Sequence, residues 1–191
     1  MPLQYDDFTH TYTVDGTVVP SVTQILKEFG FYKGEQYFTT SSSGRGKYIH
    51  EACQMYDEGV LDLDSAALEH KGYIQGWVNF LQETKLHVID IERPIYHELY
   101  RFAGTVDRFG ILYGKKVILD IKTGVPQPSD RLQTAGYQWL YNGLCELIDG
   151  RYCLYLKQNG TYKLKEHKER EDCNDFLALV RLWYRKNNKE Y

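Results

Sequence analysis

The segment Lys116-Val117-Ile118-Leu119-Asp120-Ile121-Lys122 contains the pattern that decides the predicted fold. Its apolar residues Val117, Ile118 and Leu119 lead directly into an Asp-x-Lys triplet, which predicts a β-strand. Because alternate side chains of a strand point to the same face, Asp120 and Lys122 should project together. The sequence therefore predicts a strand that presents a carboxylate and an amine side by side.

The neighbouring segments predict the rest of a sheet. In residues 88–93 and 102–111, apolar side chains recur with a period of two, which predicts two strands. Short connections lead from each predicted strand to the next. Three such strands in a row favour an antiparallel meander. Residues 151–157 and 162–167 predict two more strands, joined by a turn that contains Asn159-Gly160.

Helical periodicity surrounds these strands. The chain should begin with a hairpin over residues 10–20, turned at Asp15-Gly16, and a loop is expected at 33–44. Apolar spacing predicts helices over 22–29, 45–58, 65–86, 129–147 and 172–186. We therefore predict an α/β fold with a mixed central β-sheet flanked by helices. One domain should fill residues 1–191, with an N-terminal hairpin, helix and loop (1–45), a core (46–167) and a C-terminal helix (168–191).

Composition narrows the class of protein. The formal net charge of -3 argues against a protein that coats nucleic acid by bulk positive charge. There is no apolar run long enough to cross a bilayer and no signal-peptide pattern, so a cytoplasmic protein without membrane contact is expected. The four cysteines lack the close spacing of a zinc or iron–sulfur site and are interpreted as reduced thiols.

A second carboxylate makes the Asp-x-Lys triplet informative. By itself the triplet also fits an ion pair at a strand end that faces solvent. Asp107, however, lies on the preceding predicted strand, and antiparallel neighbours are about 5 Å apart. Two facing carboxylates repel each other unless a cation lies between them. Asp107 and Asp120 are thus candidate ligands of a divalent metal ion.

Four motifs in this order resemble the RecB-type branch of the PD-(D/E)XK nucleases, which includes phage exonucleases. They are Gly46-x-x-x-His50, Gly104-Thr105-Val106-Asp107, Asp120-Ile121-Lys122 and Gln133-x-x-x-Tyr137. The resemblance implies a restriction-endonuclease-like core and a Mg²⁺- or Mn²⁺-dependent deoxyribonuclease, most simply an exonuclease. It implies metal binding by His50, Asp107, Asp120 and the Ile121 carbonyl. Some relatives carry an iron–sulfur cluster, which the cysteine spacing here does not support.

The same resemblance assigns further roles. Asp107, Asp120, Lys122, Gln133 and Tyr137 would be catalytic, with Lys122 orienting the nucleophile and balancing charge. From the residues themselves, the candidate substrate contacts are Arg45, Lys47, Tyr37, Arg108 and Thr123. Tyr37 is chosen because it lies in the loop before the predicted helix 45–58 and offers an aromatic ring on which a base can stack. Glu92-Arg93-Pro94 also resembles a family feature, but Glu92 is interpreted as a strand-end carboxylate paired with a nearby base. Small stand-alone nucleases of this branch are typical of phages. The resemblance implies DNA as the substrate and a recombination or replication protein as a partner.

Two other functions remain open from the sequence. A non-catalytic DNA-binding or scaffold domain with a nuclease fold would be expected to lack some of the catalytic positions, all of which are present here. A structure-specific or restriction-type endonuclease usually carries extra recognition elements, and none is evident. Cleavage polarity, strand preference, the number of metal ions and the oligomeric state do not follow from the residues.

Overall fold

The computed structural model of this protein describes residues 2–31 and 40–187. Its central sheet has five strands in the order β4-β5-β6-β7-β8. Their bounds are β4 His87–His97, β5 Phe102–Leu112, β6 Lys115–Lys122, β7 Gly150–Leu156 and β8 Tyr162–Glu166. Strands β4, β5 and β6 form the predicted antiparallel meander, whereas β6 and β7 are parallel. The predicted mixed sheet is therefore confirmed.

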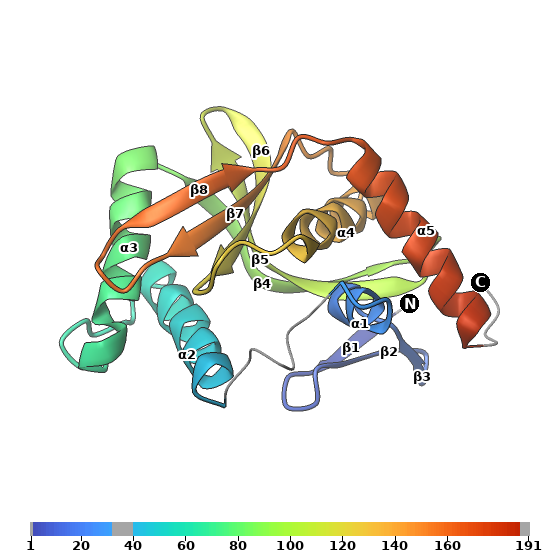
Figure 1. Ribbon diagram of the computed structural model, residues 1–191, viewed down its shortest axis with the longest axis horizontal. Coiled ribbons are helices and arrows are strands. Elements are labelled where there is room, and N and C mark those ends of the chain that lie inside the picture. The colour runs from blue at the N-terminus through green and yellow to red at the C-terminus, as the bar shows by residue number, and fades with distance from the viewer. Residues whose placement is uncertain (1, 32–39, 188–191) are drawn as a thin grey trace.

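Helices cover both faces of this sheet (Figure 1). On one face lie α1 (Val22–Glu28), α4 (Ser129–Gly143) and α5 (Glu171–Lys186), and on the other lie α2 (Thr40–Asp57) and α3 (Leu68–Thr84). Helix α4 is the crossover that links the parallel strands β6 and β7. Each face buries a separate apolar core, with Phe102, Leu140 and Phe176 in the first and Ile49, Trp77 and Leu154 in the second. Burial on both faces explains why β6 reads as an almost continuous apolar run.

A smaller antiparallel sheet precedes the core. Its strands are β1 (Leu3–Asp6), β2 (Thr11–Val14) and β3 (Thr17–Val19), so the predicted hairpin is present and gains a third strand. Tyr12, Val14 and Val19 pack against Ala103 of β5. Ala103 also donates its backbone N–H to Pro20 O at 2.9 Å. The small sheet is thus attached to the strand that carries Asp107.

Several predicted boundaries were wrong. The predicted loop over residues 33–44 extends too far, because α2 already begins at Thr40. Packing of its buried Ile49 and Cys53 supports a helix whose first turns carry no apolar pattern. Pro94 does not end β4, which pairs through Pro94 with Thr105. Strand β4 is an edge strand, where a missing N–H is tolerated.

Three apolar residues of the predicted helices 65–86 and 129–147, whose spacing indicated a buried face, are exposed instead. Helix α4 ends at Gly143, so Leu144 and Leu147 lie beyond it, with relative exposures of 41% and 77%. Leu68 begins α3 and is 86% exposed. These residues have the correct helical spacing for a buried face. They lie at or beyond a helix end, however, where no other element covers them. No helix of the described ranges combines the length and apolar character that a membrane span requires.

Candidate metal centre and active site

The candidate site lies where β5 and β6 separate. The last pair of the β5–β6 ladder is Arg108 with Leu119. Beyond it, Asp107 Oδ2 accepts a hydrogen bond from the backbone N–H of Ile121 at 2.6 Å. The Asp107 carboxylate therefore takes the place of a backbone acceptor and is held, 8% exposed, between the two strands.

Three side chains from different elements meet at this point. His50 Nδ1 of α2 lies 3.5 Å from Asp107 Oδ2 and 3.5 Å from Glu92 Oε1 of β4. One ligand atom from each residue lies within 4.8 Å of the other two. Within residues 2–31 and 40–187, these three side chains are the group of histidine, cysteine or acidic residues that lie close enough together to share a metal ion. One imidazole and two carboxylates are a donor set that suits Mn²⁺ and Mg²⁺.

Glu92 belongs to this group, although the sequence analysis assigned it no part in metal binding. Its backbone has φ of +44°, a left-handed conformation that is rare for a non-glycine residue within a strand. Such conformations cost free energy and are concentrated at functional sites. The interpretation as a strand-end carboxylate was wrong in position, because Glu92 lies in the middle of β4. The expected basic partner is present as Arg108, at 3.2 Å.

The metal group contains two carboxylates, whose negative charges a bound cation would balance. Burial opposes the charged form of His50, but Asp107 and Glu92 outweigh it and raise the pKa of His50 to about 9. Burial also raises the pKa of Asp107, with Glu92 adding to the rise and His50 opposing it. A proton on the imidazole thus compensates the facing carboxylates. The donor set fits a divalent cation, which would replace that proton.

A second group of side chains runs from Asp120 to α4. Lys122 Nζ lies 2.6 Å from Asp120 Oδ2 and donates a hydrogen bond to Gln133 Oε1 at 2.9 Å. Gln133 Nε2 in turn donates to the Tyr137 hydroxyl at 2.8 Å. Asp120 and Lys122 therefore share a strand face, and Gln133 and Tyr137 share a helix face, as their spacing predicted. Their catalytic roles remain predictions.

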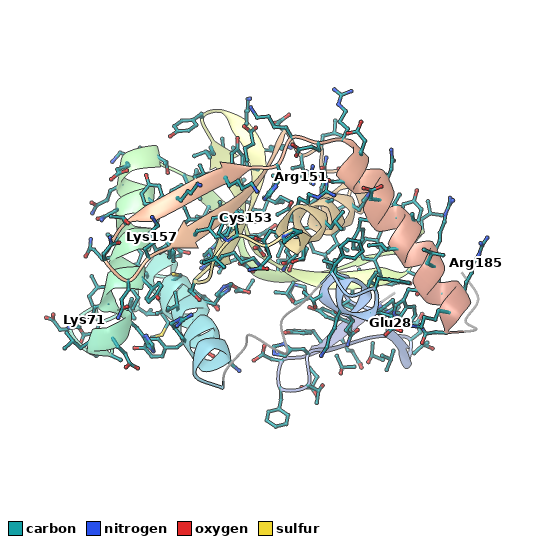
Figure 2. The ribbon with its side chains drawn as sticks, viewed as in Figure 1. Glu28, Lys71, Arg151, Cys153, Lys157 and Arg185 are labelled. Atoms are coloured by element: carbon teal, nitrogen blue, oxygen red, sulfur yellow. The ribbon has the colours of Figure 1, made fainter. Side chains whose placement is uncertain are left out.

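The predicted metal ligands are only partly assembled together. His50 and Asp107 meet, but the third member of their group is Glu92 and not Asp120. Asp120 is 2% exposed, and its carboxylate contacts Lys122 and the Cys153 thiol, at 3.6 Å from Cys153 Sγ. Figure 2 places Cys153 near the centre of the molecule. Burial raises the pKa of Asp120 to about 6, although the nearby Lys122 ammonium opposes the rise. The Asp107 carboxylate adds to the rise, which means that Asp120 lies beside the metal group without belonging to it.

The carbonyl of Ile121 is occupied by a protein group. His50 Nε2 lies 2.9 Å from Ile121 O, a hydrogen-bond distance. The same histidine therefore contacts both the carboxylates and the predicted carbonyl ligand. A cation that took Ile121 O as a ligand would share this oxygen with His50, because a carbonyl oxygen has two lone pairs.

Arg108 does not have the position predicted for a substrate contact. Its side chain is 1% exposed, and its Nε donates to Asp57 Oδ2 at 2.7 Å. Its guanidinium also lies over the Trp77 ring, 5.4 Å from the centroid. Buried between α2, α3 and β4, it cannot reach DNA at the surface. It instead holds Glu92, a role that the sequence analysis expected of a nearby base but did not assign to Arg108.

The other predicted substrate contacts differ in position. Lys47 lines the cleft above the metal group and lies 3.9 Å from Glu51 and 3.7 Å from Asp7. The Arg45 guanidinium lies over the Tyr73 ring, 5.7 Å from its centroid, and Arg45 does not line that cleft. Thr123 is half-buried directly after β6. Tyr37 lies outside the described residues.

Comparison with known proteins gives similarity in structure only. No protein-family model matches the sequence, and no curated protein matches it. Among solved structures, the chain is similar to an alkaline exonuclease (LHK-Exo) from Laribacter hongkongensis, with 13% identity, a TM-score of 0.44 and coverage of 89% of this chain and 91% of that one. The same exonuclease in complex with dAMP gives 14% identity, a TM-score of 0.40 and coverage of 89% and 93%. The crystal structure of SSO0001 gives 15% identity, a TM-score of 0.41 and coverage of 84% and 67%.

Proposed function

We propose that this protein is a divalent-metal-dependent nuclease that hydrolyses phosphodiester bonds of DNA. The observation that supports the proposal is the meeting of His50, Glu92 and Asp107 beside the Asp120–Lys122 pair. Three metal-binding side chains next to a half-buried amine are what phosphoryl hydrolysis needs, because the reaction gains negative charge in its transition state. Four motifs that resemble the PD-(D/E)XK family add to this support.

The ligand residues come from three elements. His50, Glu92 and Asp107 would hold a Mn²⁺ or Mg²⁺ ion, and Asp120 and Ile121 O are proposed as further ligands from the adjoining strand end. When bound, the ion would supply Lewis-acid polarisation of the phosphate and a lowered pKa for a water molecule. The Arg108 guanidinium fixes Glu92, and Ile121 N–H fixes Asp107, so both carboxylates are oriented before any ion arrives.

Lys122 and its partners act on the phosphate. The Lys122 ammonium lies between the Asp120 carboxylate and the Gln133 amide oxygen. We propose that it orients the attacking water and offsets the negative charge that builds up on the phosphate oxygens. Gln133, anchored by Tyr137, limits the positions that the amine can adopt. The arrangement favours the transition state because the groups are oriented before the reaction.

Substitution of Lys122 tests the proposal directly. Lys122→Ala should abolish degradation of DNA in Mg²⁺ or Mn²⁺ while leaving the circular dichroism spectrum unchanged. Lys116→Ala is the matched control, since Lys116 lies on the same strand and forms an exposed pair with Glu146. Retained cleavage by the Lys122→Ala protein would exclude the proposed mechanism.

The mode of cleavage requires a separate comparison. We propose an exonuclease that acts in DNA processing, recombination or repair. An end-labelled linear DNA should be degraded while a covalently closed circle of the same sequence is not. Cutting of the circle would indicate the structure-specific endonuclease instead. Binding of DNA without loss of either substrate would indicate the scaffold function.

A further inference from the structure

The cleft above the metal group has two unlike walls. It has a volume of about 620 Å³. The metal group of His50, Glu92 and Asp107 lines it and is the part that we call its floor. One wall is α2, which contributes Lys47 and Glu51 among others. A second wall is the small N-terminal sheet with its β1–β2 turn, which contributes Tyr5, Asp7, His10 and Tyr12. The small sheet therefore packs on β5 and also lines the candidate active site.

The aromatic residues of this wall form an ordered platform. The rings of Tyr5 and Tyr12 are stacked, with centroids 4.7 Å apart and planes inclined by 25°. Tyr12 is 5% exposed, and its hydroxyl lies 2.7 Å from Thr105 Oγ1. Thr105 lies on β5 two residues before Asp107. The platform is thus attached to the strand that carries a candidate metal ligand, so its distance from the metal group is fixed by the fold.

Tyr5 is the part of the platform that a ligand can reach. Its side chain is half-buried, with the buried Tyr12 behind it, and it lines the cleft. Its hydroxyl lies 2.9 Å from His10 Nδ1 and donates to Asp7 Oδ1 at 3.2 Å. These contacts hold the ring orientation before any ligand binds. An oriented aromatic surface needs little ordering on binding.

The charges of the two walls determine which part of a nucleotide each one accepts. Asp7 lies on the aromatic wall, and Lys47, which lies 3.7 Å from it, is shared with Glu51. That wall would repel a phosphate, whereas every nucleobase offers a π-face that stacks on an aromatic ring. A cation at the floor would attract the phosphate. One nucleotide can therefore satisfy both, with its base on the wall and its phosphate at the floor.

We propose that Tyr5, supported by Tyr12, stacks with a nucleobase of the DNA strand close to the phosphate that is cleaved. This inference rests on the proposed nuclease function and names its substrate class. A base within a duplex is already stacked between its neighbours, and removing it costs a few kcal/mol. The site therefore takes an unpaired strand or a frayed end in preference to an intact duplex.

Abasic substitutions in a single-stranded oligonucleotide test the proposal. Affinity is measured by fluorescence anisotropy with Ca²⁺, on a series of oligonucleotides that each lack one base. At one position, loss of the base should weaken binding to the unaltered protein by about 10-fold. The Tyr5→Leu protein should bind the complete strand about 10-fold more weakly, and removal of that base should then have little further effect.

Two variants separate stacking from general damage. Tyr5→Phe keeps the ring that stacks on Tyr12 and should bind DNA more tightly than Tyr5→Leu, which keeps only apolar bulk against Tyr12. Tyr113→Leu, at a tyrosine that is 74% exposed in the β5–β6 turn, is the matched control and should leave affinity unchanged. Equal affinities of the Leu and Phe variants of Tyr5, or additive effects at every abasic position, would refute the stacking site.

The outcome is distinguishable from failure of the nuclease proposal. If the unaltered protein degrades DNA in Mn²⁺ but Tyr5→Leu shows no change in affinity or in the preference for single strands, only the stacking site is refuted. If the unaltered protein does not degrade DNA at all, the nuclease proposal fails. In that case the abasic series still shows whether the wall binds a base.

Discussion

Arg108 Nη1 lies 3.2 Å from Glu92 Oε1, so the residue that follows one candidate metal ligand in the sequence holds another. The same guanidinium donates to Asp57 Oδ2 at 2.7 Å and to the Asp107 carbonyl at 2.6 Å. One buried cation therefore links α2, β4 and β5 directly behind the metal group. We therefore expect substitution of Glu92 to affect metal binding and substitution of Arg108 to affect the stability of the fold.

Glu92→Gln should weaken Mn²⁺ binding strongly. The change removes one carboxylate charge but keeps the side-chain volume. Loss of an outer-shell partner alone typically costs about 10- to 100-fold in metal affinity, and loss of a direct ligand should cost at least as much. Isothermal titration with Mn²⁺ measures the effect. Glu98→Gln, at an exposed turn residue, is the control, and equal affinities of the two variants would remove Glu92 from the site.

Arg108→Met should destabilise the fold by about 3–5 kcal/mol, because it leaves the Asp57 carboxylate buried without its partner. Urea denaturation gives the free energy of unfolding. Adding Asp57→Asn to Arg108→Met should recover part of the loss, since the two residues interact directly. Arg181→Met, at an exposed position of α5, controls for removal of an arginine, and a loss as small as that of the control would contradict the network.

Tyr137→Phe should lower turnover about 10-fold without changing metal affinity. The hydroxyl accepts a hydrogen bond from Gln133, which in turn accepts one from Lys122, so its loss would disorder the amine but not the metal ligands. Steady-state cleavage of a labelled oligonucleotide gives the rate. Tyr141→Phe is the control, since its hydroxyl lies one turn further along α4 and donates to Asp90 at 3.0 Å. Reduced Mn²⁺ affinity in Tyr137→Phe would argue against this order of contacts.

Without metal, His50 should make the stability of the fold depend on pH. Because Asp107 and Glu92 outweigh burial and raise the pKa of His50 from 6.5 to about 9, the folded state binds this proton more tightly than the unfolded chain does. The resulting stabilisation is fully present below pH 6.5 and disappears as the pH rises through 9. In EDTA, the stability difference between the unaltered protein and His50→Gln should shrink by about 2 kcal/mol from pH 7 to 9.5.

Urea titrations at a series of pH values measure this difference. His87→Gln reports the effect of removing an exposed histidine at the start of β4. A saturating divalent ion should cancel the pH dependence that is specific to His50, because a metal-bound imidazole carries no proton to lose. A stability difference for His50→Gln that does not vary with pH would mean that the carboxylates do not hold a proton on His50.

Strand β6, an apolar run that ends in an Asp-x-Lys triplet, determined much of the fold and part of the site. Its period of two placed Asp120 and Lys122 on one face, and a spacing of four placed Gln133 and Tyr137 on one turn of α4. These relationships lie within single elements, where backbone geometry fixes which side chains are neighbours. The meander of β4, β5 and β6 was also predictable, because strands joined by short connections pair with their neighbours in the chain.

Only the tertiary structure decided which groups complete the metal group. Glu92 enters it through a left-handed backbone conformation that no spacing rule reveals, and Arg108 turns inward because Asp57 of α2 is there to receive it. Tyr5 reaches the cleft because the small sheet packs on β5. Contacts between elements distant in the chain depend on packing and buried charge, which are properties of the assembled fold and not of local sequence.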